Sequence, residues 1–322
     1  MEGTPSVVSS ISHLFAVRES DGATLWAVPC HQLGGWQLWA YAEGSVFAHC
    51  GTTLHALDAA TGAPVWQWPA PGSVRQVSVA ADGLVVVAST TGGSTVTRLG
   101  LDGTERWSLD VDPDVTVRGD RSRAYVERAD GTIAVHRLDD GGLVRVLPDV
   151  PGRLQVVAGS RLFFVQEGGV DGIPADEVRL RAVDAGTGQQ LWEHRDWCPE
   201  GDRAGMQIAV ADDAVAYVTD GRINLSTCVY GALDVATGAR RWTVPASVGT
   251  LAAVPTIADG VVYYYRGVSF AVSDGVFAAL RMADGEVLLE ERVTRTSGAT
   301  VVVANGRVLL PEGAFEWVPV EG

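Results

Sequence analysis

Lysine is missing from the sequence, because all 24 of its basic residues are arginine. This absence excludes a lysine Schiff base and the phosphate-binding lysine of a P-loop. Acidic residues outnumber the basic ones, so the formal charge at pH 7 is −15. A surface of that sign repels the phosphates of nucleic acids, and we therefore expect no nucleic-acid partner.

Long apolar runs are also missing. No stretch approaches the roughly 18–20 consecutive apolar residues that a membrane-spanning helix needs. Residues 1–12 have neither the basic start nor the apolar core of a signal peptide. We expect a cytoplasmic protein if this chain is complete, and an extracytoplasmic one if it was cut from a longer precursor. We also expect a monomer without a membrane span.

Helical periodicity is absent, and a turn phrase recurs in its place. In Asp58 to Trp66, a turn containing Asp, Thr and Gly is followed by a Trp four residues after the Gly. Asp and Thr can hydrogen-bond the turn backbone, and Gly adopts a positive φ without a steric penalty. The same offsets recur in Asp184 to Trp192 and in Asp234 to Trp242. A repeat of this kind is typical of a structural unit.

The spacing of the repeat predicts the fold. Turn glycines fall at positions 22, 62, 103, 141 or 142, 188, 238 and 285. Short strands bounded by turn residues precede them, for example residues 36–42, 45–50 and 53–58. Periods of about 40 to 50 residues with four strands each are typical of β-propeller blades.

We therefore predict an all-β fold with one domain over residues 1–322. It is a seven-bladed β-propeller of four-stranded antiparallel blades. The chain begins with the last two strands of a blade and ends with the first two, so the terminal strands would complete one blade. Eight blades are the alternative, if residues 315–320 begin another blade.

The phrase Ala-x-Asp-x-x-Thr-Gly-x-x-x-Trp resembles the tryptophan-docking repeat of PQQ-type propellers, which include quinoprotein dehydrogenases and BamB-like proteins. The resemblance extends over essentially the whole chain and implies that each Trp packs between neighbouring blades. The structural residues that it implies are Gly62, Trp66, Trp107, Gly188, Trp192, Gly238 and Trp242. Degenerate copies have Arg18 for the Asp, Arg145 or Val146 for one Trp, and Leu289 for another.

The cofactor is not implied by the repeat. The enzymes of this group carry adjacent cysteines, a calcium site and a catalytic aspartate, whereas this sequence has no adjacent cysteine pair and no haem motif. We therefore expect no PQQ and no other cofactor. The sequence also lacks a G-x-S-x-G elbow, an HExxH motif and a glycine-rich phosphate loop, so it identifies no catalytic residues.

Cys30-His31 and His49-Cys50 form the sharpest cluster of reactive residues. The first pair lies between two blades and the second where a second strand turns into a third, and these loops share one face of a propeller. The four side chains could bind zinc, or the cysteines could form a disulfide if their Cα atoms lie within about 7 Å. The spacing fits no standard zinc pattern, which favours a third reading, with buried, reduced cysteines.

Other loops of the same class supply further candidates. The loop at 196–203 is longer than its counterparts and contains Trp197, Asp202 and Arg203, while Cys198 could pair with Cys228. The alternating carboxylates around Asp112 could bind calcium, but they lack the pattern of an EF-hand loop, which favours a plain acidic turn.

Two further short stretches, one aromatic and one basic, contain residues of interest. Tyr264 lies on the opposite face of its strand from its two Tyr neighbours, and core packing is the favoured reading; Arg266 follows in the same strand. The stretch Arg121-Ser122-Arg123 is too short to be read as a basic patch.

The leading hypothesis for function is a non-catalytic binding or scaffold module that engages a protein or a small molecule through its inter-blade loops. The candidate contact residues are His31, Trp36, His49, Asp112, Trp197, Asp202, Arg203, Tyr264 and Arg266. The alternative is an enzyme with a pocket in the central funnel, such as a biosynthetic tailoring or cyclising enzyme. Its residues would come from different blades, so a motif search would not find them.

Overall fold

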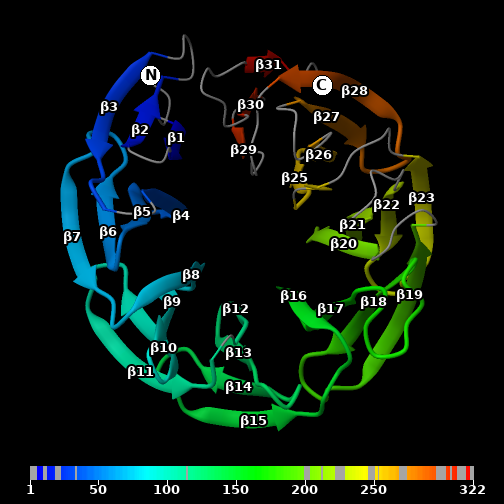
Figure 1. Cartoon of the computed structure of the whole chain (residues 1–322), viewed down its shortest axis with the longest axis horizontal. Helices are drawn as coiled ribbons and strands as arrows, with labels where there is room; N and C mark the ends of the chain where they lie inside the picture. Colours follow the sequence, from blue (N-terminus) through cyan, green and yellow to red (C-terminus); the bar gives the residue numbers. More distant parts are fainter. Residues whose placement is uncertain are drawn as a thin grey trace. The chain divides into compact units, whose positions relative to one another are not determined.

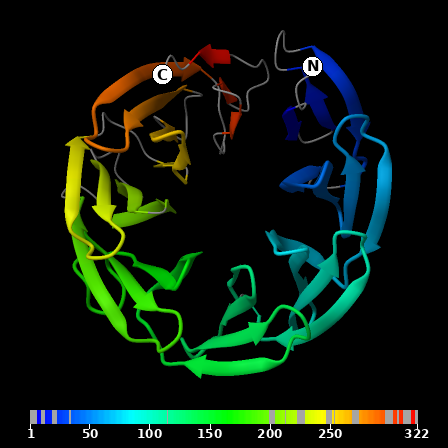
Figure 2. The same cartoon turned by 180° about the vertical axis from the view of Figure 1, so that it is seen from behind.

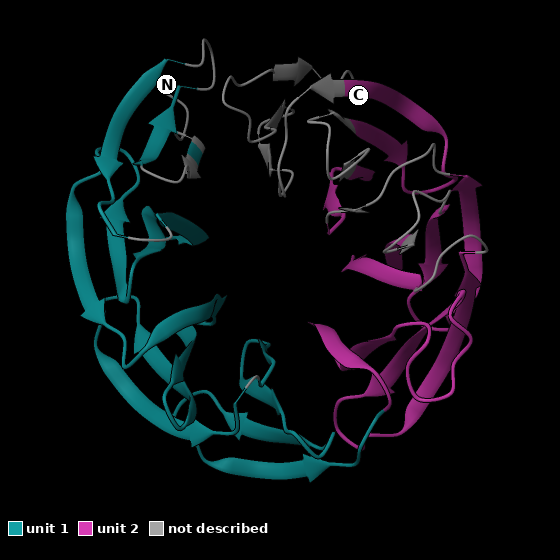
Figure 3. Cartoon of the chain, viewed as in Figure 1, with its two compact units in different colours: residues 1–150 teal, residues 151–322 magenta. Residues whose placement is uncertain are grey.

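A computed structural model describes most of the chain, and the described residues form β-strands and turns. The described ranges are 6–9, 13–18, 23–32, 35–113, 115–198, 204–211, 213–221, 229–245, 251–252, 254–267, 274–294, 302–304, 307–309 and 317–319. Over these ranges there is no helix long and apolar enough to span a bilayer. The chain divides into two compact units, residues 1–150 and 151–322 (Figure 3).

Unit 1 contains four antiparallel sheets in chain order (Figure 1). The first sheet is β1 (Ser6–Ser9), β2 (His13–Val17) and β3 (Thr24–Pro29); the second is β4 (Trp36–Ala42), β5 (Ser45–Cys50), β6 (Thr53–Asp58) and β7 (Pro64–Pro69). The third is β8 (Ser73–Ala80), β9 (Gly83–Thr90), β10 (Gly93–Gly100) and β11 (Glu105–Val111); the fourth is β12 (Val117–Gly119), β13 (Arg123–Glu127), β14 (Ile133–Arg137) and β15 (Leu143–Leu147). Figures 1 and 2 show β7, β11 and β15 along the outer edge of this unit.

Unit 2 repeats the pattern. Its first two sheets are β16 (Arg153–Ala158), β17 (Arg161–Gln166), β18 (Glu177–Asp184) and β19 (Gln190–Trp197), then β20 (Ala204–Val210), β21 (Ala214–Gly221), β22 (Val229–Asp234) and β23 (Arg240–Pro245). The next contains β24 (Leu251–Ala252), β25 (Thr256–Ala258), β26 (Val261–Gly267), β27 (Asp274–Arg281) and β28 (Val287–Thr294), and the last β29 (Val302–Ala304), β30 (Arg307–Leu309) and β31 (Trp317–Pro319). Both β24 and β25 pair with β26, so the third sheet is a four-stranded blade whose first strand is divided.

The predicted repeat of four antiparallel strands is confirmed between residues 36 and 294, where six consecutive sheets carry it. The terminal sheets differ from the expectation of two strands each. In the described residues each has three, because Ser6–Ser9 pairs with β2 and Trp317–Pro319 pairs with β30. The tail that formed the basis of the eight-blade alternative is therefore a strand of the last sheet.

The recurring Trp lies against the turn glycine of the following sheet. The indole Nε1 of Trp66 donates a hydrogen bond to the carbonyl of Leu101 at 2.7 Å, and its ring covers Gly103. A Cβ atom on Gly103 would lie 2.7 Å from the ring, and its φ is +81°, so a side chain is excluded there. We call this arrangement the tryptophan latch. The other latches join Trp26 to Ala59 and Gly62, Trp107 to Leu138 and Gly141, Trp192 to Val235 and Gly238, and Trp242 to Met282 and Gly285.

The turn chemistry follows the sequence pattern. In the second sheet, the Asp58 carboxylate accepts hydrogen bonds from the backbone N–H of Thr61 at 2.8 Å and from its hydroxyl at 2.7 Å. Asp184 with Thr187 and Asp234 with Thr237 repeat these contacts. Strand register decides whether Arg145 or Val146 replaces the missing Trp. Each latch Trp pairs with the residue that precedes a bulge, as Trp66 pairs with Ala56, and Arg145 pairs in the same way with Val135. Arg145 therefore occupies the position of the missing Trp.

Apolar side chains are buried between neighbouring sheets. Between the third and fourth sheets, for example, Val85 and Val87 of β9 belong to the same buried cluster as Val117, Ala124 and Val126. This packing fixes adjacent sheets within a unit and leaves their connecting turns at the two ends of the strands.

Candidate functional site

Each sheet has a loop end and a latch end. In the second sheet, Trp36 at the start of β4 pairs with Cys50 at the end of β5, and Thr53 pairs with Pro69. The connection from the preceding sheet and the turn between the second and third strands therefore meet at one end, which we call the loop end. The tryptophan latches lie at the opposite end, which we call the latch end.

A disulfide joins two loop-end segments in unit 1. It links Cys30, which follows β3, to Cys50, which ends β5, and their Cα atoms are 5.9 Å apart. Of the three readings of this cluster, the disulfide is the one found, which corrects the favoured reading of reduced cysteines. The bond also removes both thiolates from the candidate zinc site, and in the described ranges no group of three or more His, Cys, Asp or Glu side chains could hold a metal ion.

Tryptophan and histidine side chains surround this disulfide. Trp36 is buried, donates its indole N–H to the carbonyl of Val28 at 2.9 Å, and meets the ring of His55 edge-on at 4.9 Å. The indole N–H of Trp39 donates to Nδ1 of His49 at 2.7 Å. His31 is exposed next to Cys30. Of the predicted contact residues at this end, Trp36 is therefore buried and His49 half-buried, whereas His31 is exposed.

Burial controls the protonation of the two packed histidines. Loss of solvation lowers the pKa of His49, and the same effect, followed by repulsion from His49, lowers the pKa of His55. Nδ1 of His49 accepts the hydrogen bond from Trp39, which requires that this nitrogen carry no proton. Both rings are accordingly neutral at pH 7. They pack against the neighbouring tryptophans as uncharged side chains.

A pocket of about 340 Å³ lies between the third and fourth sheets of unit 1, and its rim includes loop-end residues. Apolar side chains make up its floor: Leu109, Val111, Val115, Val126 and Ala134. Asp110, Asp112, Arg128 and His136 supply its polar groups. The His136 Nδ1 lies 2.9 Å from the carbonyl of Gly141, so that nitrogen is the donor. An apolar floor with charges of both signs at the rim suits a side chain of a partner protein better than a metal ion.

The predicted residues of unit 2 are dispersed. Trp197 ends β19 with 48% of its surface exposed, as a contact residue requires. Asp202, Arg203 and Cys228 lie outside the described residues. Cys198 is buried in the core cluster between the sheets of β16–β19 and β20–β23.

Tyr264 is a core residue, which confirms the favoured reading of core packing and removes Tyr264 from the candidate contacts. Only 1% of it is exposed, and its ring centroid lies 4.3 Å from that of Tyr230. Burial raises the pKa of its hydroxyl well above the ordinary value. Arg266, two residues further on, is described only as part of the backbone of β26, opposite Val276.

One buried polar cluster was not found from the sequence. The hydroxyl of Tyr217 donates to Asp196 at 2.7 Å, and Arg240 approaches the same carboxylate at 3.3 Å. Burial opposes ionisation of Asp196, but His194, whose Nε2 lies 3.6 Å from the carboxylate, and the hydrogen bond from Tyr217 hold its pKa below the ordinary value. Tyr217 has no exposed surface and the Asp196 side chain is 10% exposed, so of these three residues only Arg240 is open to solvent. No local signal links Asp196 to a tyrosine 21 residues away.

Comparison with solved structures shows the same fold. The computationally designed Ika8 protein matches with a TM-score of 0.72 and 15% identity over 98% of this chain and 93% of that one. BamB from Moraxella catarrhalis matches with a TM-score of 0.62 and 18% identity over 96% and 91%. A europium-containing methanol dehydrogenase matches with a TM-score of 0.60 and 13% identity over 97% and 81%. At these identities the likeness establishes the β-propeller fold and not an activity.

A search of curated proteins finds no match. A family model, in contrast, matches residues 11–154 and 176–316, which is most of the chain, and its family is described as outer membrane protein assembly factor BamB. The matched segments contain all five tryptophan latches and the disulfide. The chain therefore belongs to the BamB family of PQQ-like β-propellers.

Proposed function

We propose that this protein is a non-catalytic binding module that engages a protein partner through the loop end of unit 1. The disulfide between Cys30 and Cys50 is the observation that carries the proposal. It ties the connection between two sheets to a turn of the second sheet, so the backbone next to the exposed His31 is anchored before binding. A pre-ordered loop loses less conformational entropy when it binds.

The pocket at Asp112 supports the same surface. Its apolar floor can receive one large side chain of a partner, while Arg128 and Asp112 at the rim can select its polar neighbours. The family description, an assembly factor, is that of proteins that work with other proteins, and it supports a protein partner over a small substrate.

The disulfide also supports an extracytoplasmic location. Disulfides persist in oxidising compartments such as the bacterial periplasm and are rare in the cytosol. Of the two locations that the sequence leaves open, we therefore propose the extracytoplasmic one. The proposal includes no PQQ, in keeping with the expectation from the sequence.

Site-specific photo-cross-linking tests the proposed surface. A photoreactive phenylalanine analogue is placed at His31 or at Asp112, both exposed, and at Ala60 as a control, which is exposed in a latch-end turn of the second sheet. We expect one and the same partner protein to be captured from both loop-end positions and not from Ala60. Equal capture from Ala60, or different proteins from His31 and Asp112, would contradict the proposal.

A further inference from the structure

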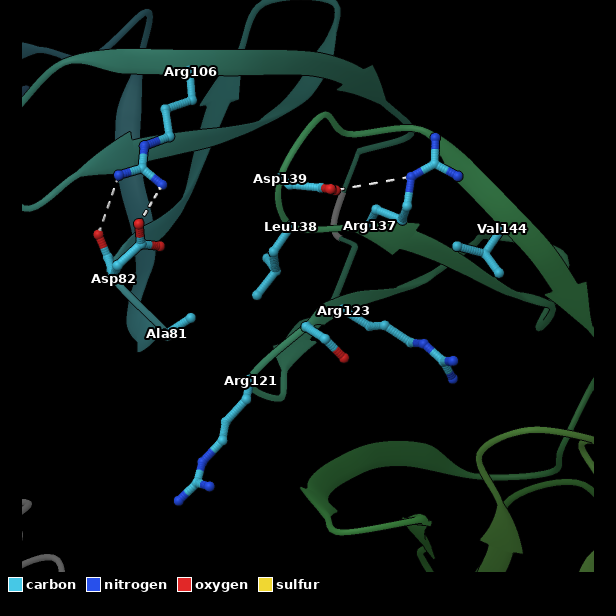
Figure 4. Close-up of a pocket in the computed structure, with 10 residues that line it drawn as sticks. Ala81, Asp82, Arg106, Arg121, Arg123, Arg137, Leu138, Asp139 and Val144 are labelled. Carbon is cyan, nitrogen blue, oxygen red and sulfur yellow. Dashed lines mark hydrogen bonds and ion pairs between the residues drawn. The ribbon is translucent and has the colours of Figure 1, made fainter.

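A second and larger cleft opens at the latch end of unit 1, between the third and fourth sheets. Its volume is about 570 Å³. Its charged lining consists of Arg106, Arg121, Arg123, Arg137, Asp82 and Asp139, and its apolar lining of Ala81, Leu138 and Val144. Figure 4 shows Arg106 with Asp82 on one side of Leu138 and Arg137 with Val144 on the other. We call this the arginine cleft.

One carboxylate serves two guanidinium groups at the first wall of the cleft. Asp82 accepts a hydrogen bond from Arg106 at 2.8 Å and another from Arg98 at 3.0 Å. Arg98 is 1% exposed, and its Nε and Nη1 have no hydrogen-bond partner among the described residues. Asp82 can therefore balance only one of these two guanidinium charges. Because Arg98 is buried, its charge is poorly solvated and its field is screened little.

The opposite wall is held by local ion pairs. Arg137 binds Asp140 at 2.7 Å and lies 3.8 Å from Asp139. Its side chain is half exposed. Pairs at such exposure contribute little, so a ligand with a stronger charge can share or replace the aspartate at Arg137.

The turn between β12 and β13 adds two arginines without a carboxylate partner. Asp120 is occupied by this turn, because it accepts backbone N–H groups from Ser122 at 2.7 Å and Arg123 at 2.8 Å, and the hydroxyl of Tyr125 at 3.0 Å. Neither Arg121 nor Arg123 forms a salt bridge with any residue that the structure describes. Arg121 is exposed, and Arg123 pairs across the strands with Arg137.

We propose that the arginine cleft binds a small phosphomonoester. Guanidinium forks match the oxygens of a phosphate, and a phosphomonoester carries a charge of about −1.5 to −2 at pH 7. The cleft falls in the range of roughly 300–1,000 Å³ that is usual for small organic ligands and is far larger than an inorganic phosphate requires. Leu138 and Val144 supply an apolar wall for the organic part. The site is independent of the proposed function, because it lies at the opposite end of the sheets.

Titration calorimetry with phenyl phosphate, inorganic phosphate and succinate tests the proposal. We expect phenyl phosphate to bind about tenfold more tightly than inorganic phosphate, because its ring meets the apolar wall, and more tightly than succinate, whose carboxylates carry the charge at different spacing. Binding should weaken as salt is added, since the cleft is open to solvent.

Arginine variants locate the site. Arg121→Gln and Arg123→Gln should each weaken phenyl phosphate binding by about tenfold, the effect of one charge-assisted contact in a solvated cleft. Arg153→Gln, which removes an exposed arginine at the start of β16, is the matched control and should leave the affinity unchanged. No binding to the wild-type protein, equal affinity for succinate or for inorganic phosphate, or an affinity unaffected by both cleft variants would each overturn the proposal. Because Arg121 is exposed on a turn, loss of binding with an unchanged melting temperature is attributable to the ligand contact.

Discussion

The latch of Trp107 in unit 1 and the latch of Trp242 in unit 2 are built from the same parts. In each, an arginine precedes the Trp and pairs with an aspartate in the turn between the first and second strands. These pairs are Arg106–Asp82 and Arg241–Asp213. In each, another arginine, in the third strand of the following sheet, pairs with an aspartate three residues on: Arg137–Asp140 and Arg281–Asp284.

The two junctions differ in the residues that surround these shared contacts. Asp82 also binds the buried Arg98, whereas the corresponding residue beneath Asp213 is Ala232. At the start of the second strand of the next sheet, Arg123 faces Arg137 in unit 1, where Val261 faces Arg281 in unit 2. Arg241 has two carboxylate partners, Asp213 and Asp234, whereas its counterpart Arg106 pairs with Asp82 alone among the described residues. The two junctions therefore share the latch and its backbone arrangement. A few side chains on the neighbouring strands and turns determine whether each junction attracts anions.

Removing the Trp at each latch would test whether the two latches contribute equally to the free energy of unfolding. Trp242 is 8% exposed, and replacing it by Ala should lower the free energy of unfolding by about 3–5 kcal/mol, through lost apolar burial and an unfilled cavity. Trp107 is less buried, so Trp107→Ala should cost less, about 2 kcal/mol. Urea denaturation with a constant m-value is the measurement. Equal losses would show that exposure of the indole does not govern the strength of the latch.

Removing the disulfide would leave its junction with the latch of Trp26 but without a covalent link, as at the two junctions compared above. The bridge closes a loop with a sequence separation of 20, for which chain entropy predicts a loss of about 3 kcal/mol in Cys30→Ala/Cys50→Ala. A reductant should lower the melting temperature of the wild-type protein toward that of the variant and leave the variant unaffected. A wild-type protein that melts identically with and without reductant would show that the bridge does not constrain the unfolded chain.

The sequence predicts the strands and turns better than it predicts the disulfide and the arginine cleft. The expected strands 36–42, 45–50 and 53–58 coincide with β4, β5 and β6, because alternating burial and turn residues are local properties. The disulfide could only be one of three readings, since it depends on how closely two loops approach. Arg121-Ser122-Arg123 is short when taken alone. It becomes part of a site only because folding brings it to Arg106 and Arg137, which lie on other strands.

Converting one junction toward the other sharpens the comparison. Arg123→Val gives the arginine cleft the residue that Val261 provides in unit 2, and we expect phenyl phosphate affinity to fall about tenfold with little change in stability. The mirrored change, Val261→Arg, adds an arginine of the same strand position in unit 2 and should leave the affinity of the arginine cleft unchanged. Calorimetry and urea denaturation of both variants give the two measurements. If Val261→Arg strengthened phenyl phosphate binding at the cleft, the net charge of the protein and not the position of the arginine would govern the affinity.

The smallest expected effect is a dependence of stability on pH that belongs to the disulfide-linked junction. Folding lowers the pKa of His49 and His55, so between their folded and unfolded values the unfolded chain binds more protons. The stabilisation is complete above the unfolded pKa of about 6.5 and is lost as pH falls through the folded values. The pKa of Asp58 is also lowered, but its effect on stability begins only near the ordinary aspartate value of 3.8, outside this window.

Urea denaturation at pH 7 and pH 5 checks this expectation with the double variant His49→Gln/His55→Gln. Glutamine cannot be protonated in this range and can still accept the hydrogen bond of Trp39. The wild-type protein should lose more stability than the variant between the two pH values. The latches of Trp107 and Trp242 contain no such pair, so Trp107→Ala and Trp242→Ala should keep the wild-type pH dependence. Equal losses of stability in the wild-type protein and the histidine variant would contradict this expectation. They would mean that the two rings are protonated in the folded state as readily as in the unfolded chain, and that they are not buried at the loop end.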